Sequence, residues 1–173
     1  MEMQTDNPRL PYTDPVAAGG ASVSAESLAL HGASGAGDVS RVRALLSSLP
    51  AGVSLPVPAA QYLGQARFRS AANDLRDASA AGDVEAMRSV LRAWRADPSL
   101  RDPSAGDMDT ALILAAQNAR GAAVRLLLGE GVPVGLTAPK LAAKEGDGAA
   151  EVFQAFLDHG WNVNSFDRIP ALQ

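Results

Sequence analysis

The chain of 173 residues contains no cysteine, and aromatic residues make up only 5% of it. Without cysteine it can form neither a disulfide framework, nor a thiol nucleophile, nor a thiolate metal site. A core with few aromatic side chains has to be built from alanine, leucine and valine, and small residues let helices approach closely. The lack of cysteine also favours a reduced compartment, so we expect an intracellular protein, cytoplasmic or nuclear.

The chain also lacks an excess of positive charge. It has 15 Lys and Arg against 19 Asp and Glu, which gives a net charge of −4. Nucleic acids and anionic membrane surfaces are bound mainly through basic residues, so we expect no nucleic-acid partner and no membrane partner. No uncharged apolar run approaches the roughly 20 residues of a membrane span. Residues 1–15 lack the basic start and apolar core of a secretory signal.

Proline and glycine divide the chain into segments. Residues 1–23 contain three prolines and show no apolar period, which predicts a flexible N-terminal arm. From residue 24 onward apolar residues recur at helical spacing, as at Val42, Leu45, Leu46 and Leu49. This pattern is interrupted by an insertion over residues 50–72. Its first part, residues 50–66, is rich in proline and glycine and is expected to be irregular.

The helical segments come in pairs. Each pair has a short alanine-rich segment, a break and then a longer leucine- and valine-rich segment. The alanines that mark the first segments are spaced by 45, 37 and 27 residues, and they are Ala33, Ala78, Ala115 and Ala142. Repetition with a period near the thirties is typical of a solenoid of helical hairpins.

The third pair resembles an ankyrin repeat. Residues 110–116 read Thr-Ala-Leu-Ile-Leu-Ala-Ala where that family has Thr-Pro-Leu-His-x-Ala-Ala, and residues 124–131 match its Val-x-Leu-Leu-Leu-x-x-Gly. The fourth pair ends in Gly-Trp-Asn-Val-Asn over residues 160–164, which is similar to the family's Gly-Ala-Asp-Val-Asn. Four such units follow one another, and together they extend the resemblance over about residues 27–173.

The resemblance implies an all-α solenoid of ankyrin-like helical hairpins with short β-hairpin or loop fingers, over residues 24–173. The expected segments are repeats at about 27–49, 73–100, 109–135 and 137–164, and a truncated fifth repeat at 165–173. Stacking would place eight apolar side chains in one continuous buried layer. They are Leu45, Leu46, Val90, Leu91, Leu127, Leu128, Phe156 and Leu157. The uncapped C-terminal repeat would be a further surface for association.

By the same resemblance, the chain is expected to be a non-catalytic scaffold that binds an unknown protein partner on its concave face. The contact residues would come from the finger tips, the exposed positions of the first helices and the exit of the last unit. They are Arg101, Asp107, Asp109, Gln117, Asn118, Lys144, Glu145, Trp161 and Phe166.

Residues that could carry chemistry are few. His31 and His159 are far apart in the sequence and have no cysteine near them, so we interpret both as structural and expect no zinc site. The acidic cluster of Asp102, Asp107 and Asp109 lacks the spacing of an EF-hand, and solvated loop charge is the preferred interpretation over a cation site.

Three arginines, Arg88, Arg92 and Arg95, fall on one stripe of a helix in the second unit. The stripe is either a solvated face, partly paired with Glu85, or a patch for an anionic partner. The alternative overall function is an accessory or regulatory domain of a larger protein, or a small enzyme built on a helical-repeat frame. An enzyme would need a pocket with convergent titratable groups, and since the sequence suggests none, we expect no catalysis, cofactor or metal.

Overall fold

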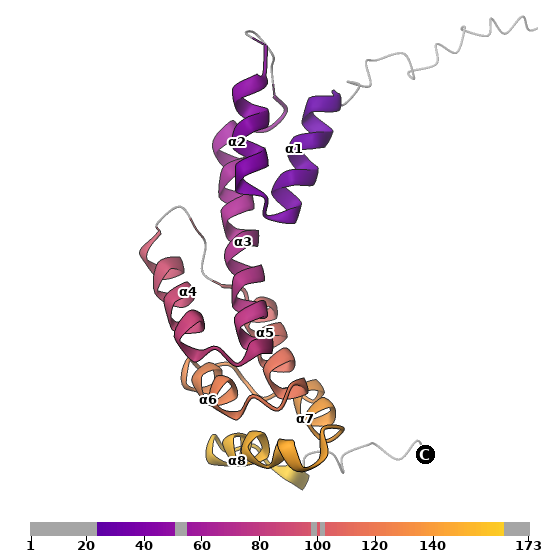
Figure 1. Cartoon of the computed structure of the whole chain (residues 1–173), viewed down its shortest axis with the longest axis vertical. Coiled ribbons are helices and arrows are strands. Elements are labelled where there is room, and N and C mark those ends of the chain that lie inside the picture. Colours follow the sequence, from indigo (N-terminus) through magenta and orange to yellow (C-terminus); the bar gives the residue numbers. More distant parts are fainter. Residues whose placement is uncertain (1–23, 51–54, 98–99, 101–102, 165–173) are drawn as a thin grey trace, which may run out of the picture.

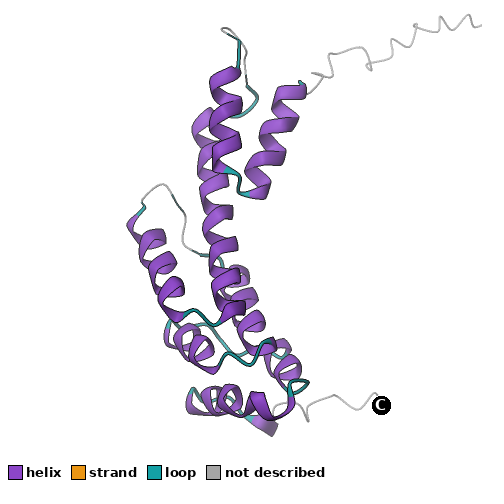
Figure 2. Cartoon of the chain, viewed as in Figure 1, coloured by secondary structure: helices purple, strands orange, loops and turns teal. Residues whose placement is uncertain are grey.

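A computed structural model describes residues 24–50, 55–97, 100 and 103–164 (Figure 1). These residues form α-helices and short 3-10 segments, and they contain no strand (Figure 2). The described part is therefore all-α, as the sequence predicts, but it does not confirm the expected β-hairpin fingers. The expected N-terminal arm (1–23) and truncated fifth repeat (165–173) lie outside it.

In chain order the elements are α1 (Ala25–Ala36), α2 (Val39–Ser48), α3 (Ala59–Ala81), α4 (Val84–Ala96), α5 (Ala105–Gln117), α6 (Gly121–Gly129), α7 (Thr137–Ala142), the 3-10 helix η2 (Gly146–Ala149) and α8 (Ala150–Asp158).

Local sequence signals set several helix ends. The side chains of Ser24, Asp38, Asp83 and Ser104 each accept a hydrogen bond from a backbone N–H in the first turn of α1, α2, α4 and α5. At α1 the Ser24 hydroxyl also affects the pKa of a neighbouring carboxyl. The backbone N–H of Glu26 and that hydroxyl lower the pKa of the Glu26 carboxyl, because both donate to its charged form.

Helix α3 has 23 residues and begins at Ala59. The prediction of irregular structure through residue 66 is therefore wrong from residue 59 onward. The three prolines of this segment all precede the helix, and Pro58 is at its N-cap position, where the missing N–H breaks no helical bond. Only Gly64 weakens the helix interior, by about 1 kcal/mol. The burial of Tyr62, Ala66 and Phe68 offsets that cost.

The later helices form stacked pairs. Helices α3 and α4, α5 and α6, and α7 and α8 pack together, and the first helices α3, α5 and α7 also lie side by side (Figure 1). The second helices α4, α6 and α8 form a second row beside them. This two-row arrangement buries one large apolar core between the rows.

Four of the eight side chains expected in one buried layer are buried in that core, and Val90 is half-buried beside it. Leu91, Leu127, Leu128 and Phe156 are 0–6% exposed. The expected burial of Leu157 is wrong, because this side chain is 48% exposed. Helix α8 is the last described helix of its row, so only one of its sides faces α6. An apolar residue on its other side has no helix of the described chain to cover it.

The first pair, α1 and α2, does not join the main core. Its apolar side chains pack with the N-terminal half of α3 in a second, smaller core of Leu30, Ala33, Val42, Tyr62 and Ala66. Leu45 and Leu46 lie only partly buried at its margin. The expected continuous layer through all four units is therefore divided into two cores along α3.

Two equivalent glycines show how the first pair is displaced. Gly37 and Gly82 both have a φ of 79° and end the first helix of their units. A Cβ on Gly82 would lie 2.7 Å from the Arg120 side chain, in the turn of the next unit, whereas a Cβ on Gly37 would lie 2.7 Å from the backbone nitrogen of Ser70. In the second unit this glycine lies beside the turn of the next unit, which for Gly37 would be the turn at Gly82. Gly37 lies beside Ser70 instead, which is about 18 Å before Gly82 along α3. The first pair is shifted along α3 by that amount.

Candidate interaction surfaces

Four of the expected contact residues lie at one end of the first-helix row. Gln117 and Asn118 end α5, Lys144 and Glu145 follow α7, and all four are exposed. The two segments approach closely, because a Cβ on Gly148 of η2 would lie 3.2 Å from the Cβ of Ala119. We call these four residues the turn-end group. Within it, the Asn118 side-chain amide donates to the Leu114 carbonyl at 2.8 Å and so closes the end of α5.

Asp109 does not join the turn-end group. It lies near the start of α5, where its carboxylate is 3.7 Å from the Cβ position of Gly135. Eight residues of helix separate it from Gln117, which corresponds to about 12 Å. The structure therefore divides the expected contact surface between the two ends of the row.

Asp107 is not a surface residue. It is 7% exposed, and its carboxylate accepts from Arg76 of α3 at 3.1 Å and from the Ser104 hydroxyl at 2.5 Å. The interpretation of Asp107 as solvated loop charge is thus wrong, because α5 begins before it and turns its side chain onto α3. Asp107 serves the interface between α3 and α5, and a partner cannot reach it. Asp102 lies outside the described residues.

Trp161 packs inward. Its ring is half-buried, 6.0 Å from the Phe153 ring and 5.9 Å from the Phe156 ring, so it extends the main core. The exposed apolar side chains near this end are Leu136, Leu157 and Val163. Of the remaining expected contact residues, Arg101 and Phe166 lie outside the described part of the chain.

The two histidines make local contacts. Nδ1 of His31 lies 2.8 Å from the Ser27 carbonyl, and its ring meets Tyr62 edge-on at 5.0 Å. Nδ1 of His159 lies 2.9 Å from the Ala155 carbonyl. Both rings therefore donate to a carbonyl one turn earlier in their own helix. Neither meets two other potential metal ligands, and the described residues hold no group of three His, Asp or Glu side chains that suits a metal ion.

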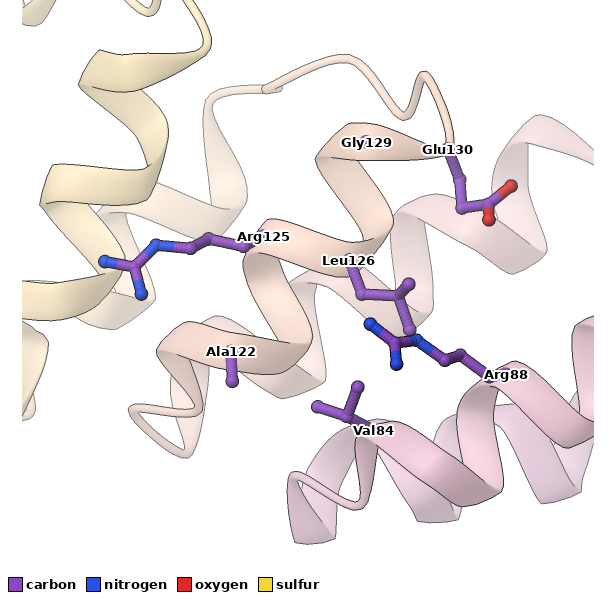
Figure 3. A pocket seen from close by; sticks show the side chains of 7 residues that line it. All are labelled: Val84, Arg88, Ala122, Arg125, Leu126, Gly129 and Glu130. Carbon is purple, nitrogen blue, oxygen red and sulfur yellow. The ribbon is translucent and has the colours of Figure 1, made fainter.

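A groove between α4 and α6 is a surface that the sequence did not indicate. Two adjoining hollows of about 510 and 380 Å³ share Arg88, Leu126 and Glu130, and together they follow both helices. Figure 3 shows the larger one, with Val84 and Arg88 on α4 facing Ala122 and Leu126 on α6. The arginine stripe was recognised from its helical spacing. Its pairing with α6 depends on the stacking of two units, which no local pattern specifies.

Among the residues that the structure describes, no helix is both long and apolar enough to cross a bilayer. No family model, curated protein or solved structure matches the chain. The resemblance to ankyrin repeats therefore stays a prediction from the sequence pattern.

Proposed function

We propose that the chain is a non-catalytic scaffold that binds a protein partner on the row of first helices α3, α5 and α7. The supporting observation is the two-row arrangement, in which each first helix is backed by a second helix and by a shared core. Such a surface is rigid before binding, so little conformational entropy is lost when a partner docks.

Within this row, the turn-end group is the preferred contact region. Gln117, Lys144 and Glu145 are exposed and carry polar or charged groups of both signs. Charged groups at the rim of an interface select partners and steer their approach, and their substitution changes binding without disturbing the fold. Asp109 contributes at the opposite end of α5 if the partner spans the whole row.

The experiment compares two doubly substituted chains with equal net charge. Gln117→Arg with Lys144→Glu changes the turn-end group, and Ser40→Arg with Arg43→Glu makes the same charge change on exposed positions of α2. Proteins captured from a native lysate are identified by peptide sequencing and quantified for each chain.

We expect the first double variant to lose most of a specifically captured protein, and the α2 variant to retain it. Circular dichroism should show equal helicity in both. Equal capture by the two variants, or no protein enriched above a bead control, would count against a binding surface on the first-helix row.

A further inference from the structure

Beyond the first-helix row, the groove between α4 and α6 has an unusual combination of floor and rim. Its floor is apolar, formed by Val84, Leu91 and Leu126, of which Leu91 is 3% exposed and the other two are half-buried. Its rim is charged. Four arginines and two glutamates line the two hollows, which gives a local charge of +2 on a chain with a net charge of −4.

The two glutamates are already paired. Glu85 accepts from Arg88 at 3.0 Å, and Glu130 accepts from Arg95. The other two arginines, Arg92 and Arg125, are exposed and have no carboxylate at ion-pair distance within the described chain. The Nε of Arg92 donates only to the Arg88 carbonyl, at 3.3 Å. Figure 3 shows Arg125 at the edge of the larger hollow, extending from α6 toward α8 and away from α4.

The groove has no side chain at its floor where it passes Gly129. A Cβ built on Gly129 would meet no atom within 4 Å, so packing inside the protein does not require a glycine there. The hollow is therefore open space along the end of α6, wide enough to receive a side chain from outside.

From these observations we infer that the groove between α4 and α6 binds an acidic amphipathic peptide segment of a partner protein. Apolar side chains of the segment cover Val84 and Leu126, while its carboxylates pair with Arg92 and Arg125. An amphipathic helix laid between two helices uses the same combination of apolar anchors and flanking charges. Guanidinium groups bind carboxylates in a bidentate manner, which adds orientation to the attraction.

The same features disfavour a nucleic acid. Phosphate backbones carry no apolar groups to cover the floor, and Glu85 and Glu130 would repel them from within the groove. The net negative charge of the whole chain opposes a polyanion as well. A peptide can place its few carboxylates beside the two unpaired arginines and keep them away from the two glutamates.

The test begins with a selection that does not assume the peptide sequence. Random dodecapeptides displayed on phage are selected against the whole chain, with counter-selection against Gly129→Trp, which fills the groove without changing its charge. The enriched peptides should carry Asp or Glu together with Leu, Ile or Phe at helical spacing. Enrichment of basic peptides, or no peptide that distinguishes the two chains, would overturn the inference.

An enriched peptide is then made synthetically, and its affinity is measured by fluorescence anisotropy. Arg92→Glu with Arg125→Glu should weaken binding by about tenfold or more. Arg41→Glu with Arg43→Glu, which makes the same charge change on exposed positions of α2, should leave it unchanged. Binding should also weaken as salt concentration rises, because exposed charges are screened.

Two results would contradict the peptide site at this stage. One is equal loss of affinity in both double variants, which would indicate attraction to the overall charge and not to the groove. The other is a single-stranded oligonucleotide that competes at or below the peptide's concentration. Neither result bears on the first-helix row, since the turn-end variants leave the groove intact.

Discussion

At the scale of single residues, the ion pair between Arg76 and Asp107 joins two helices that are distant in sequence. The two side chains are 29% and 8% exposed and lie 3.1 Å apart. Asp107 also accepts from the Ser104 hydroxyl, whereas the buried Nε of Arg76 has no acceptor among the residues that the structure describes. The pair links α5 to α3. Removing the Asp107 carboxylate would leave more of the partly buried Arg76 guanidinium without an acceptor, which should be costly.

We expect Asp107→Ala to lower the free energy of unfolding by about 1–3 kcal/mol, because it leaves the Arg76 guanidinium partly buried without a counter-charge. Asp109→Ala, two residues along the same helix and only half-buried, should change it by less than about 0.5 kcal/mol. Urea denaturation measures both values.

A double-mutant cycle with Arg76→Ala separates the pair from other effects of each substitution. We expect a coupling energy of about 1 kcal/mol or more between Arg76 and Asp107. Strictly additive single substitutions would mean that the two side chains do not stabilise each other.

At the scale of elements, α3 is the part that both cores share. Near its N-terminus α3 supplies Tyr62 and Ala66 to the smaller core, and from Phe68 onward it supplies Phe68, Ala72 and Leu75 to the larger one. The ring of Phe68 meets that of Trp94 of α4 at 5.2 Å, while the Asn73 side-chain amide, further along α3, still donates to the Ala36 carbonyl of α1 at 3.4 Å. The segments of α3 that contact α4 and the first pair therefore overlap. The continuity of α3 is therefore required to keep the first pair attached in a fixed position.

We expect Gln65→Pro to destabilise the chain by about 3 kcal/mol or more, since proline removes a helical hydrogen bond and clashes with the preceding turn. Gln65 is exposed, so the loss cannot come from its side-chain contacts. Thermal unfolding followed by circular dichroism gives the change in stability.

Ala59→Pro is the matched control, because Ala59 is the first residue of α3 and its N–H has no helical acceptor. Its effect should be close to zero. A similarly small effect of Gln65→Pro would mean that α3 is not one continuous helix in solution.

At the scale of the whole molecule, the two cores differ greatly in size. Among the described residues, the larger contains 21 buried side chains and the smaller contains five. Burial of apolar surface is the main source of stability, so the α1–α2 pair is held much more weakly than the stacked pairs. Regions of a protein that are held by fewer buried contacts open locally at a lower free energy.

We expect native-state hydrogen exchange to show the amides of α1 and α2 opening at a lower free energy than those of α5 and α6. Increasing urea should then expose α1 and α2 first. A single common opening free energy for all four helices would show that the two cores unfold as one cooperative unit.

Sequence patterns predicted that helices occur in pairs but not how the pairs pack on one another. Local residues account for the helix ends, because Asp38 and Asp83 cap α2 and α4, and Gly37 and Gly82 end α1 and α3. The candidate surfaces were predicted only in part. The turn-end residues are exposed as expected, whereas Asp107 and Trp161 are turned inward by contacts with distant helices.

For the described residues, the sequence by itself determined that helices form and that most of them come in hairpin pairs, because helix formation depends on spacing, capping and breaks that are local. Only the tertiary structure decided that the first pair is displaced along α3, that Asp107 is paired with Arg76 and that α4 and α6 enclose a groove. These features depend on which helix packs against which, and at what position along its length. The packing of the helices is determined by the summed burial of side chains that are far apart in the chain, and no short segment of sequence specifies it.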